Sequence, residues 1–222
     1  MINIFIGYDS RMPEDYMVAF TSLMEKSSVP LSITTLNLRN LRTIYSRDID
    51  PKASNEFSYS RFLVPYLSEY TGWSIFVDGD VVFLDDVWRL CMLRDDHYAL
   101  QVVKHDYTPK STIKFRGNKQ HVYPKKNWSS VMMFNNERCR ALTVDKVNNS
   151  SGAYLHQFKW LEEYEVGSLP IFWNYLVGEY DSDVSTNNIS LLHYTEGTPV
   201  HDEYRSCDFA ENWLKYGRKY IY

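Results

Sequence analysis

The first part of the chain alternates between two kinds of apolar pattern, and this alternation most constrains the fold. Residues 2–6 form a β-branched apolar run that stops at Gly7, as a buried strand followed by a loop would. Pro13 then begins a stretch of apolar side chains at helical spacing, with acidic residues in its first turn. A second strand-like run covers residues 31–38. This order of strand, loop, helix and strand predicts a parallel sheet covered by helices.

Strand and helix patterns continue to alternate through the rest of the chain. Strands are predicted at residues 74–77, 81–84, 98–103, 131–134 and 189–194. Helices are predicted at residues 57–70 with an interruption at Pro65, 85–93 with Asp85 as the cap, 136–147 with Asn136 as the cap, 153–163, and from about 208 onward. No repeat or linker divides the chain. We therefore expect one α/β domain over residues 1–222, with a central mixed, mostly parallel sheet flanked by helices.

The composition argues against several classes of protein. The net charge of −4 gives no reason to expect nucleic-acid binding. No run of about 18 apolar residues is present, so no transmembrane helix is expected, and the N-terminus lacks the pattern of a signal peptide. Three widely spaced cysteines fit neither a disulfide framework nor a zinc cluster. Together these features predict a cytoplasmic protein.

Two carboxylates, Asp78 and Asp80, interrupt an apolar stretch at residues 76–83. The flanking runs are typical of strands, so both acids are expected at a sheet edge, where Gly79 allows a tight turn and close approach of a ligand. Neighbouring carboxylates repel each other unless a cation lies between them or one is protonated. A divalent cation whose shell is completed by diphosphate oxygens would satisfy both. The structural alternative is a turn in which the acids only make Asx turns.

A second candidate group follows the strand predicted at residues 189–194. His193 stands at the end of that strand, where a neutral imidazole can complete a metal site or can instead bond to a loop carbonyl. Gly197, in the next turn, would let backbone N–H groups approach phosphate oxygens. The chain also holds 18 tyrosines, 11 phenylalanines and 6 tryptophans, which suit either stacking on sugars and bases or an aromatic core.

Six segments along the chain carry a family resemblance. They are Phe5–Asp9, Tyr59–Pro65, Val77–Asp80, Asn127–Asn135, Leu169–Asn174 and His193–Pro199. In this order the chain resembles small glycosyltransferases with the nucleotide-sugar-binding fold called GT-A, and is similar to the glycogenin-like group and to compact bacterial and large-DNA-virus glycosyltransferases. The resemblance implies a nucleotide-binding half at residues 1–103 and a half for the sugar and the acceptor at residues 104–222.

The resemblance also implies roles for individual residues. Asp80 would bind Mn²⁺ or Mg²⁺ directly, Asp78 would face the ribose or the metal, and His193 would be the third protein ligand, so that Asp78 and Asp80 form the predicted catalytic pair. Tyr8 and Asp9 would hold the base and the ribose. Arg61 would approach the diphosphate or an acid of the motif. The other predicted donor-binding residues are Gly79, Asn127, Ser129, Ser130 and Gly197, with Trp128 or Trp173 as a stacking wall.

One position departs from the family pattern. In the glycogenin-like group a lysine follows the His-Gly motif, whereas Pro199, Val200 and His201 follow it here. A basic partner for the phosphates must then come from elsewhere. Residues 104–127 are a candidate, since they hold seven basic residues against one acidic residue, although a solvated surface loop explains them as well.

The predicted function is a metal-dependent hexosyl- or deoxyhexosyltransferase for glycan biosynthesis, with a UDP-sugar as donor and a hydroxyl group as acceptor. Glu162, Glu163 and Asp181 are candidate bases for an inverting reaction. One alternative is a haloacid-dehalogenase-type phosphatase with Asp78 as nucleophile and Asp80 as general acid, for which residues 178–183 supply a poor second acidic pair. The other alternative is a non-catalytic protein that binds carbohydrate or nucleotide sugar.

Overall fold

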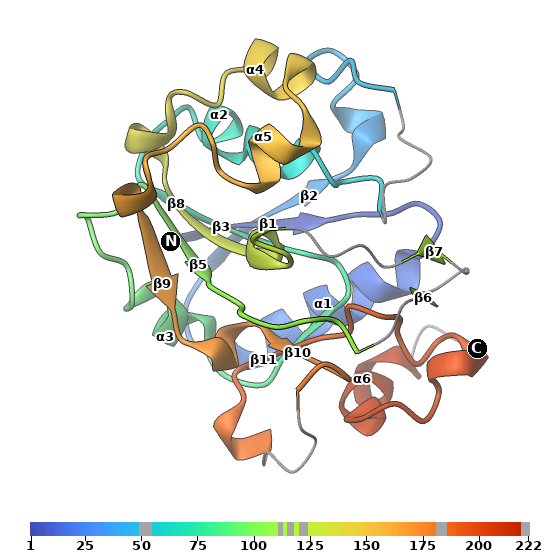
Figure 1. The fold of residues 1–222 in the computed structure, drawn as a ribbon. Helices are drawn as coiled ribbons and strands as arrows, with labels where there is room; N and C mark the ends of the chain where they lie inside the picture. Colours follow the sequence, from blue (N-terminus) through green and yellow to red (C-terminus); the bar gives the residue numbers. More distant parts are fainter. Residues whose placement is uncertain (49–54, 111–112, 115–117, 120–123, 181–185, 219–222) are drawn as a thin grey trace.

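The computed structural model describes residues 1–48, 55–110, 113–114, 118–119, 124–180 and 186–218. Within these ranges the central sheet has six strands in the order β2-β1-β3-β8-β5-β9 (Figure 1). Their bounds are β1 Ile2–Gly7, β2 Leu31–Leu36, β3 Trp73–Val77, β5 Leu100–Val103, β8 Val131–Asn135 and β9 Val166–Leu169. β1 pairs in parallel with β2 and β3, β8 is antiparallel to β3 and β5, and β9 is parallel to β5. The predicted mixed α/β sheet is confirmed.

Alternate residues of the central strands enter two separate cores, one on each face of the sheet. Phe5 and Phe76 belong to one core, whereas their neighbours Ile4, Ile6 and Ile75 belong to the other. This is the two-residue period of a strand, applied to a sheet that is covered on both sides. Because both faces are covered, the inner strands β3 and β8 are mostly apolar in the sequence.

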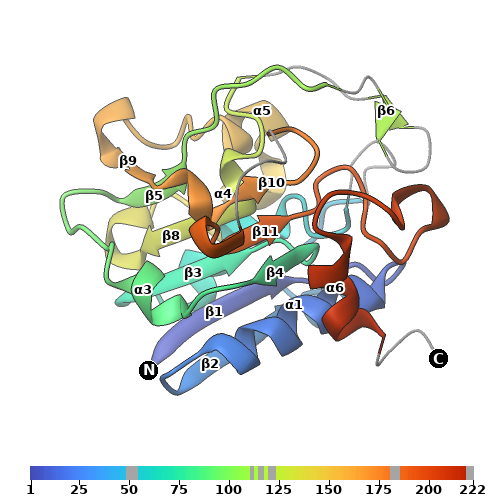
Figure 2. The same cartoon turned by 90° about the horizontal axis from the view of Figure 1, so that it is seen from below.

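Helices cover both faces of the central sheet. Figure 1 shows α2 (Val64–Leu67), α4 (Val144–Asn149) and α5 (Gly152–His156) on one side, with α1 (Pro13–Lys26) and α3 (Val87–Cys91) on the other. Helix α6 (Ala210–Gly217) lies beside α1 (Figure 2), and its Trp213 and Tyr216 share a third core with Val18. No helix in the described ranges is long and apolar enough to cross a membrane.

A smaller sheet collects the strands that lead to the candidate site. Its order is β10-β11-β4, with β4 at Val81–Phe83, β10 at Tyr175–Leu176 and β11 at Leu191–His193. β11 is antiparallel to β4, and His193 pairs with Val81 in the register. The chain therefore leaves the central sheet at the end of β3 and enters this second sheet as β4. Two further short strands, β6 (Ile113–Lys114) and β7 (Asn118–Lys119), pair with each other.

Several predicted helices were too long or were given the wrong cap. Residues 57–70 hold a 3₁₀ turn and the four-residue α2, and the helix stops because Glu69 and Tyr70 adopt left-handed backbone conformations. The helix predicted at 153–163 ends at His156, shortly before Phe158, which is also left-handed. Such residues end a helix without a glycine to signal it.

The capping predictions for two other helices were also wrong. Asp86, and not Asp85, caps α3, because its carboxylate accepts the hydrogen bond from the Trp88 N–H. Asn136 begins a 3₁₀ turn, and the helix after it is the separate α4, which is capped by Thr143. In both cases the sequence offers two suitable caps, Asp85 and Asp86 for one helix and Asn136 and Thr143 for the other, and does not distinguish them.

Candidate active site

The Asp78-Gly79-Asp80 segment forms the junction between the two sheets. The N–H of Asp78 bonds to the carbonyl of Ser130 and so extends the contact between β3 and β8, whereas the carbonyl of Asp80 accepts from the N–H of Tyr194, beyond the end of β11. A Cβ at Gly79 would lie 2.6 Å from the carbonyl oxygen of Gly7. Two backbone segments meet there at a distance that only glycine allows, and this contact fixes the direction of the turn.

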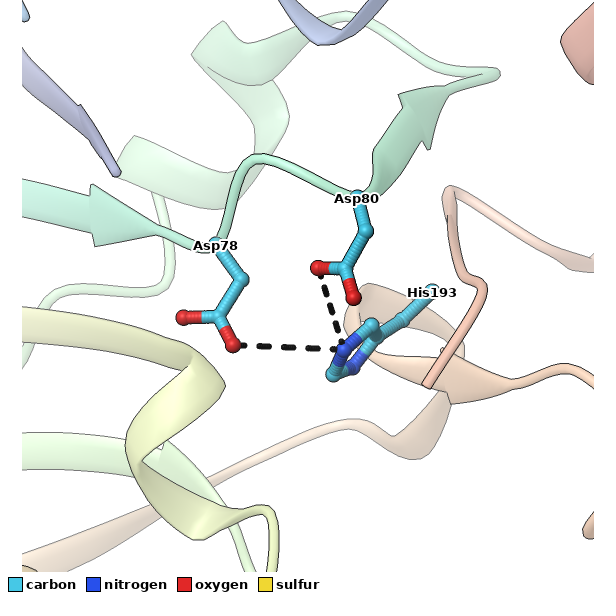
Figure 3. A group of neighbouring side chains, drawn as sticks. All are labelled: Asp78, Asp80 and His193. Atoms are coloured by element: carbon cyan, nitrogen blue, oxygen red, sulfur yellow. Dashed lines mark ion pairs between the residues drawn. The ribbon is translucent and has the colours of Figure 1, made fainter. Parts of the chain in front are cut away.

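Asp78, Asp80 and His193 come together at this junction. Their side chains point toward one another, with the acids at the ends of β3 and β4 and the imidazole on β11 (Figure 3). The His193 Nε2 lies 3.4 Å from Oδ1 of Asp80 and 4.0 Å from Oδ2 of Asp78. Potential ligand atoms of all three residues lie within 4.8 Å of one another, so this group could hold a metal ion. Two carboxylate oxygens and an imidazole nitrogen suit Mn²⁺-like cations, so the donor set fits the expected metal.

Arg61 approaches an acid of the motif, which was one of the two positions predicted for it. Its Nη1 lies 2.7 Å from Oδ1 of Asp78, and both side chains are buried. The same guanidinium donates to the carbonyl of Ser129 and lies over the rings of Phe57 and Phe76. The ion pair thus holds one oxygen of Asp78 and leaves the other directed at His193. Removing one partner of such a buried ion pair leaves the other charge buried without compensation, which lowers the stability of the fold.

A cavity whose empty volume of about 790 Å³ includes open solvent lies beside Asp80, whereas Asp78 and His193 are outside its described lining. Among the predicted donor-binding residues, Asp9, Gly79 and Gly197 line it, together with the predicted metal ligand Asp80. The N–H of Gly197 donates to the Tyr194 carbonyl, and a Cβ there would collide with the ring of Tyr204, so this glycine closes a tightly packed turn.

The other predicted donor-binding residues lie outside the described lining of the cavity. The Tyr8 ring packs edge-on against Tyr16, which does line it. Ser129 and Ser130 are buried, and the Ser129 hydroxyl lies 2.8 Å from Nδ1 of His156. The side-chain amide of Asn127 donates to the Tyr107 hydroxyl. These residues surround the site, but they are not part of its described surface.

The two tryptophans proposed as a stacking wall have other surroundings. Trp173 is buried in the core between the sheet and α1, which excludes it from contact with a sugar. Trp128 is partly buried, and its indole N–H donates to the carbonyl of His105. The prediction for Trp173 was wrong because a 3₁₀ turn at Ile171–Trp173 directs its ring inward.

The cavity also contains acidic residues that the sequence did not single out. Asp15, in the first turn of α1, is buried and accepts a hydrogen bond of 2.7 Å from the Thr198 hydroxyl. Burial raises the pKa of Asp15 well above its usual value.

The basic residues in the described lining of the cavity are Arg11 and His201. The Arg11 guanidinium makes a bidentate contact with the carboxylate of Asp9.

The remaining sequence candidates do not converge on this cavity. Glu162 and Glu163 are exposed and outside the described lining, and Glu163 pairs with Lys125 at 2.8 Å. Asp181 lies outside the described residues, as does part of the basic stretch at 104–127. The described lining holds no lysine, and Arg11 is its only residue with a permanent positive charge.

The fold of this chain recurs in glycosyltransferases of known structure. The bifunctional glycosyltransferase WbbM superposes with a TM-score of 0.67 at 13% identity over 97% of this chain and 49% of its own. GlyE of Streptococcus pneumoniae superposes with a TM-score of 0.61 at 14% sequence identity, over 97% of this chain and 60% of GlyE. The galactosyltransferase LgtC superposes with a TM-score of 0.58 at 14% sequence identity, over 98% of this chain and 96% of LgtC. The chain therefore spans about half of WbbM and three fifths of GlyE, and its fold is GT-A, as the sequence resemblance implied.

A relative is also found at the level of sequence. No known family model matches the chain. Protein CDI of Arabidopsis thaliana is 43% identical over 224 residues, which cover 98% of this chain and 86% of that protein. The chain belongs to the family of Protein CDI.

Proposed function

We propose that the protein is a metal-dependent glycosyltransferase that moves a sugar from a nucleotide sugar, with a UDP-sugar as donor, to a hydroxyl group of a glycan or other acceptor. The observation that carries this proposal is the convergence of Asp78, Asp80 and His193 from two sheets, with Asp80 in the lining of a cavity. The GT-A fold supports it, because the structural relatives named above are glycosyltransferases.

In this proposal the residues of the junction hold Mn²⁺ or Mg²⁺, with Asp80 and His193 as direct ligands and Asp78 as the third. A bound divalent cation would offset the negative charge that builds up on a leaving diphosphate. Arg61 fixes the direction of the Asp78 carboxylate through its 2.7 Å ion pair. The close contact between Gly79 and Gly7 holds the turn at the mouth of the cavity.

The remainder of the cavity would hold the nucleoside and the sugar. Asp9 lies in the lining beside Arg11, where its carboxylate can accept hydrogen bonds from ribose hydroxyls and Arg11 can contact a phosphate. The bond between the anomeric carbon and the phosphate oxygen breaks, and a bond to the acceptor oxygen forms. The acceptor proton passes to a base, and the nucleoside diphosphate leaves.

The transferase proposal accounts for the surroundings of the acids better than the phosphatase alternative does. A phosphatase nucleophile at Asp78 would have to attack phosphorus, yet one of its oxygens is held by the buried Arg61 and the other is directed at His193. The phosphatase mechanism has no use for His193. A non-catalytic binding protein would have the same fold, and turnover distinguishes it from an enzyme.

A binding screen followed by a turnover assay tests the proposal. Thermal unfolding is measured with UDP, GDP and their sugar conjugates, each with Mn²⁺ and with chelator. The expected result is stabilisation by one class of nucleotide that requires the metal, followed by slow release of nucleoside diphosphate from its sugar conjugate. Stabilisation without turnover would favour the binding protein, and no metal-dependent stabilisation by any nucleotide would overturn the proposal.

A further inference from the structure

A chain of buried hydrogen bonds runs from His193 away from the two acids. The His193 Nδ1 lies 2.9 Å from Oδ1 of Asn174. The Asn174 Nδ2 lies 2.9 Å from Nε2 of His105, and the His105 Nδ1 lies 2.6 Å from the Tyr180 hydroxyl. Asn174 is fully buried, and both histidines are nearly so. The candidate metal group is thus connected to polar side chains on its far side.

The direction of the Asn174 amide is fixed by a neighbour that can only accept. Its Nδ2 lies 3.1 Å from the backbone carbonyl oxygen of Asn127. A carbonyl cannot donate, so the amide nitrogen must face Asn127, and the amide oxygen must then face His193. Because that oxygen accepts, Nδ1 of His193 carries the proton. In the neutral ring the lone pair is then on Nε2, which is the atom that faces Asp78 and Asp80.

His105 supports the same orientation from the other side. Its Nε2 accepts from the second hydrogen of the Asn174 amide, and its Nδ1–H donates to Tyr180. Burial lowers the pKa of His105 to about 3. The ring therefore stays neutral at physiological pH and keeps one nitrogen as an acceptor for Asn174.

The local backbone explains why Asn174 reaches this position. The residue follows the 3₁₀ turn at Ile171–Trp173 and immediately precedes β10, which runs parallel to β11. Leu176 on β10 pairs with His193 on β11. This parallel pairing holds the Asn174 side-chain amide beside the His193 imidazole.

We propose that Asn174 is a positioning residue that holds His193 in the Nδ1–H tautomer and so presents the Nε2 lone pair to a cation at Asp78 and Asp80. The part that concerns the cation rests on the proposed function, whereas the part that concerns the tautomer does not. Outer-shell hydrogen bonds of this kind orient histidine ligands and set their basicity, and their loss typically reduces metal affinity about 10- to 100-fold.

The first measurement is the tautomer of His193 in the metal-free wild-type protein. Nitrogen-15 NMR of the imidazole rings at alkaline pH, with His193→Gln to assign the signals, distinguishes a protonated ring nitrogen from an unprotonated one. The expected result is a protonated Nδ1 and an unprotonated Nε2. In Asn174→Ala the two nitrogen signals should move toward each other as the tautomers mix. A wild-type His193 that is protonated on Nε2 would overturn the proposal without any variant being needed.

The second measurement is the affinity for Mn²⁺ alone, from the electron paramagnetic resonance signal of the free ion. Asn174→Ala should raise the Mn²⁺ dissociation constant by about 10- to 100-fold. Asn136→Ala is the matched control, because Asn136 is equally buried but donates to Thr71 and Ser74, at the other end of β3. Its Mn²⁺ affinity should match the wild type.

The outcomes separate this inference from the proposed function. A folded Asn174→Ala protein with wild-type Mn²⁺ affinity overturns the positioning role, even if the protein is a transferase. A wild-type protein that binds no Mn²⁺ overturns the proposed metal dependence, and the tautomer measurement then decides by itself whether Asn174 controls His193.

Discussion

Asp80 and His193 face each other across a single antiparallel strand pair, with 3.4 Å between the carboxylate and Nε2 of the imidazole. The register pairs His193 with Val81, and Asp80 immediately precedes Val81. Because side chains alternate between the two faces of a regular strand, Asp80 would point away from His193 if it simply continued β4. Its carboxylate reaches the imidazole because Asp80 lies in the turn before β4. The site is therefore a product of both the strand pairing and this turn. Substitutions at either residue should change ligand binding with little change in the fold.

Asp80→Asn should remove most of the metal-dependent gain in UDP affinity, at least about tenfold, because it removes a charged ligand from the group. Titration calorimetry with UDP, in millimolar Mn²⁺ and in chelator, measures this gain. Asp85→Asn is the matched control, since both acid side chains are 28% exposed and Asp85 pairs with Arg89 on the surface. Equal UDP affinity in metal and in chelator for the wild type would contradict the prediction.

Arg61→Met should lower the free energy of unfolding by about 3–5 kcal/mol, because it leaves the buried Asp78 carboxylate without its cation. Urea unfolding measures the change. Arg89→Met should cost less than about 1 kcal/mol, because its ion pair with Asp85 is exposed to water. Similar losses for the two variants would mean that Arg61 does not hold a charged Asp78.

Asp15→Asn should change how stability depends on pH. The raised pKa keeps Asp15 protonated in the folded state while the unfolded chain releases the proton above a pH of about 4. Wild-type stability should therefore fall relative to the variant, by up to about 1.4 kcal/mol per pH unit, from that pH up to the folded-state pKa. Unfolding curves at a series of pH values test the sign, and a constant difference between the two proteins would refute it.

Tyr8→Ala should weaken UDP binding by about 1–3 kcal/mol if the base stacks at the end of β1. Tyr8 itself is outside the described lining, but its ring contacts Tyr16, which is in it. Calorimetry with UDP measures the loss, and the exposed Tyr164→Ala serves as the control. An unchanged UDP affinity in a folded Tyr8→Ala protein would place the base elsewhere.

The sequence predicted β1 and β3, because Ile2–Gly7 and Trp73–Val77 are mostly buried and therefore mostly apolar. It did not predict β9 or β10. It also placed Asp78, Asp80 and His193 at strand ends, where they do converge. It did not show that β4 leaves the central sheet. A strand pattern records burial but does not identify the partner strand.

Other features depend on tertiary contacts that leave no local signal. The acidic first turn of α1 looked like a complement to the helix dipole, whereas Asp15 is buried against Thr198. Asn174 was part of a recognised segment, but its role depends on His105, His193 and Asn127, which are all distant in sequence. The left-handed residues Tyr70 and Phe158, which follow the early ends of α2 and α5, are likewise not signalled by a glycine.

The junction at Gly79 has a mechanical consequence. Asp78 continues the hydrogen bonding of the central sheet, and Asp80 that of the smaller one, so one glycine separates two bodies. A metal ion bound by both acids and His193 would link the two sheets across Gly79. Binding of the ion should then slow amide hydrogen exchange in β4 and β11 more than in β1 and β3. The exchange rates of the smaller sheet would therefore report whether the ion is bound.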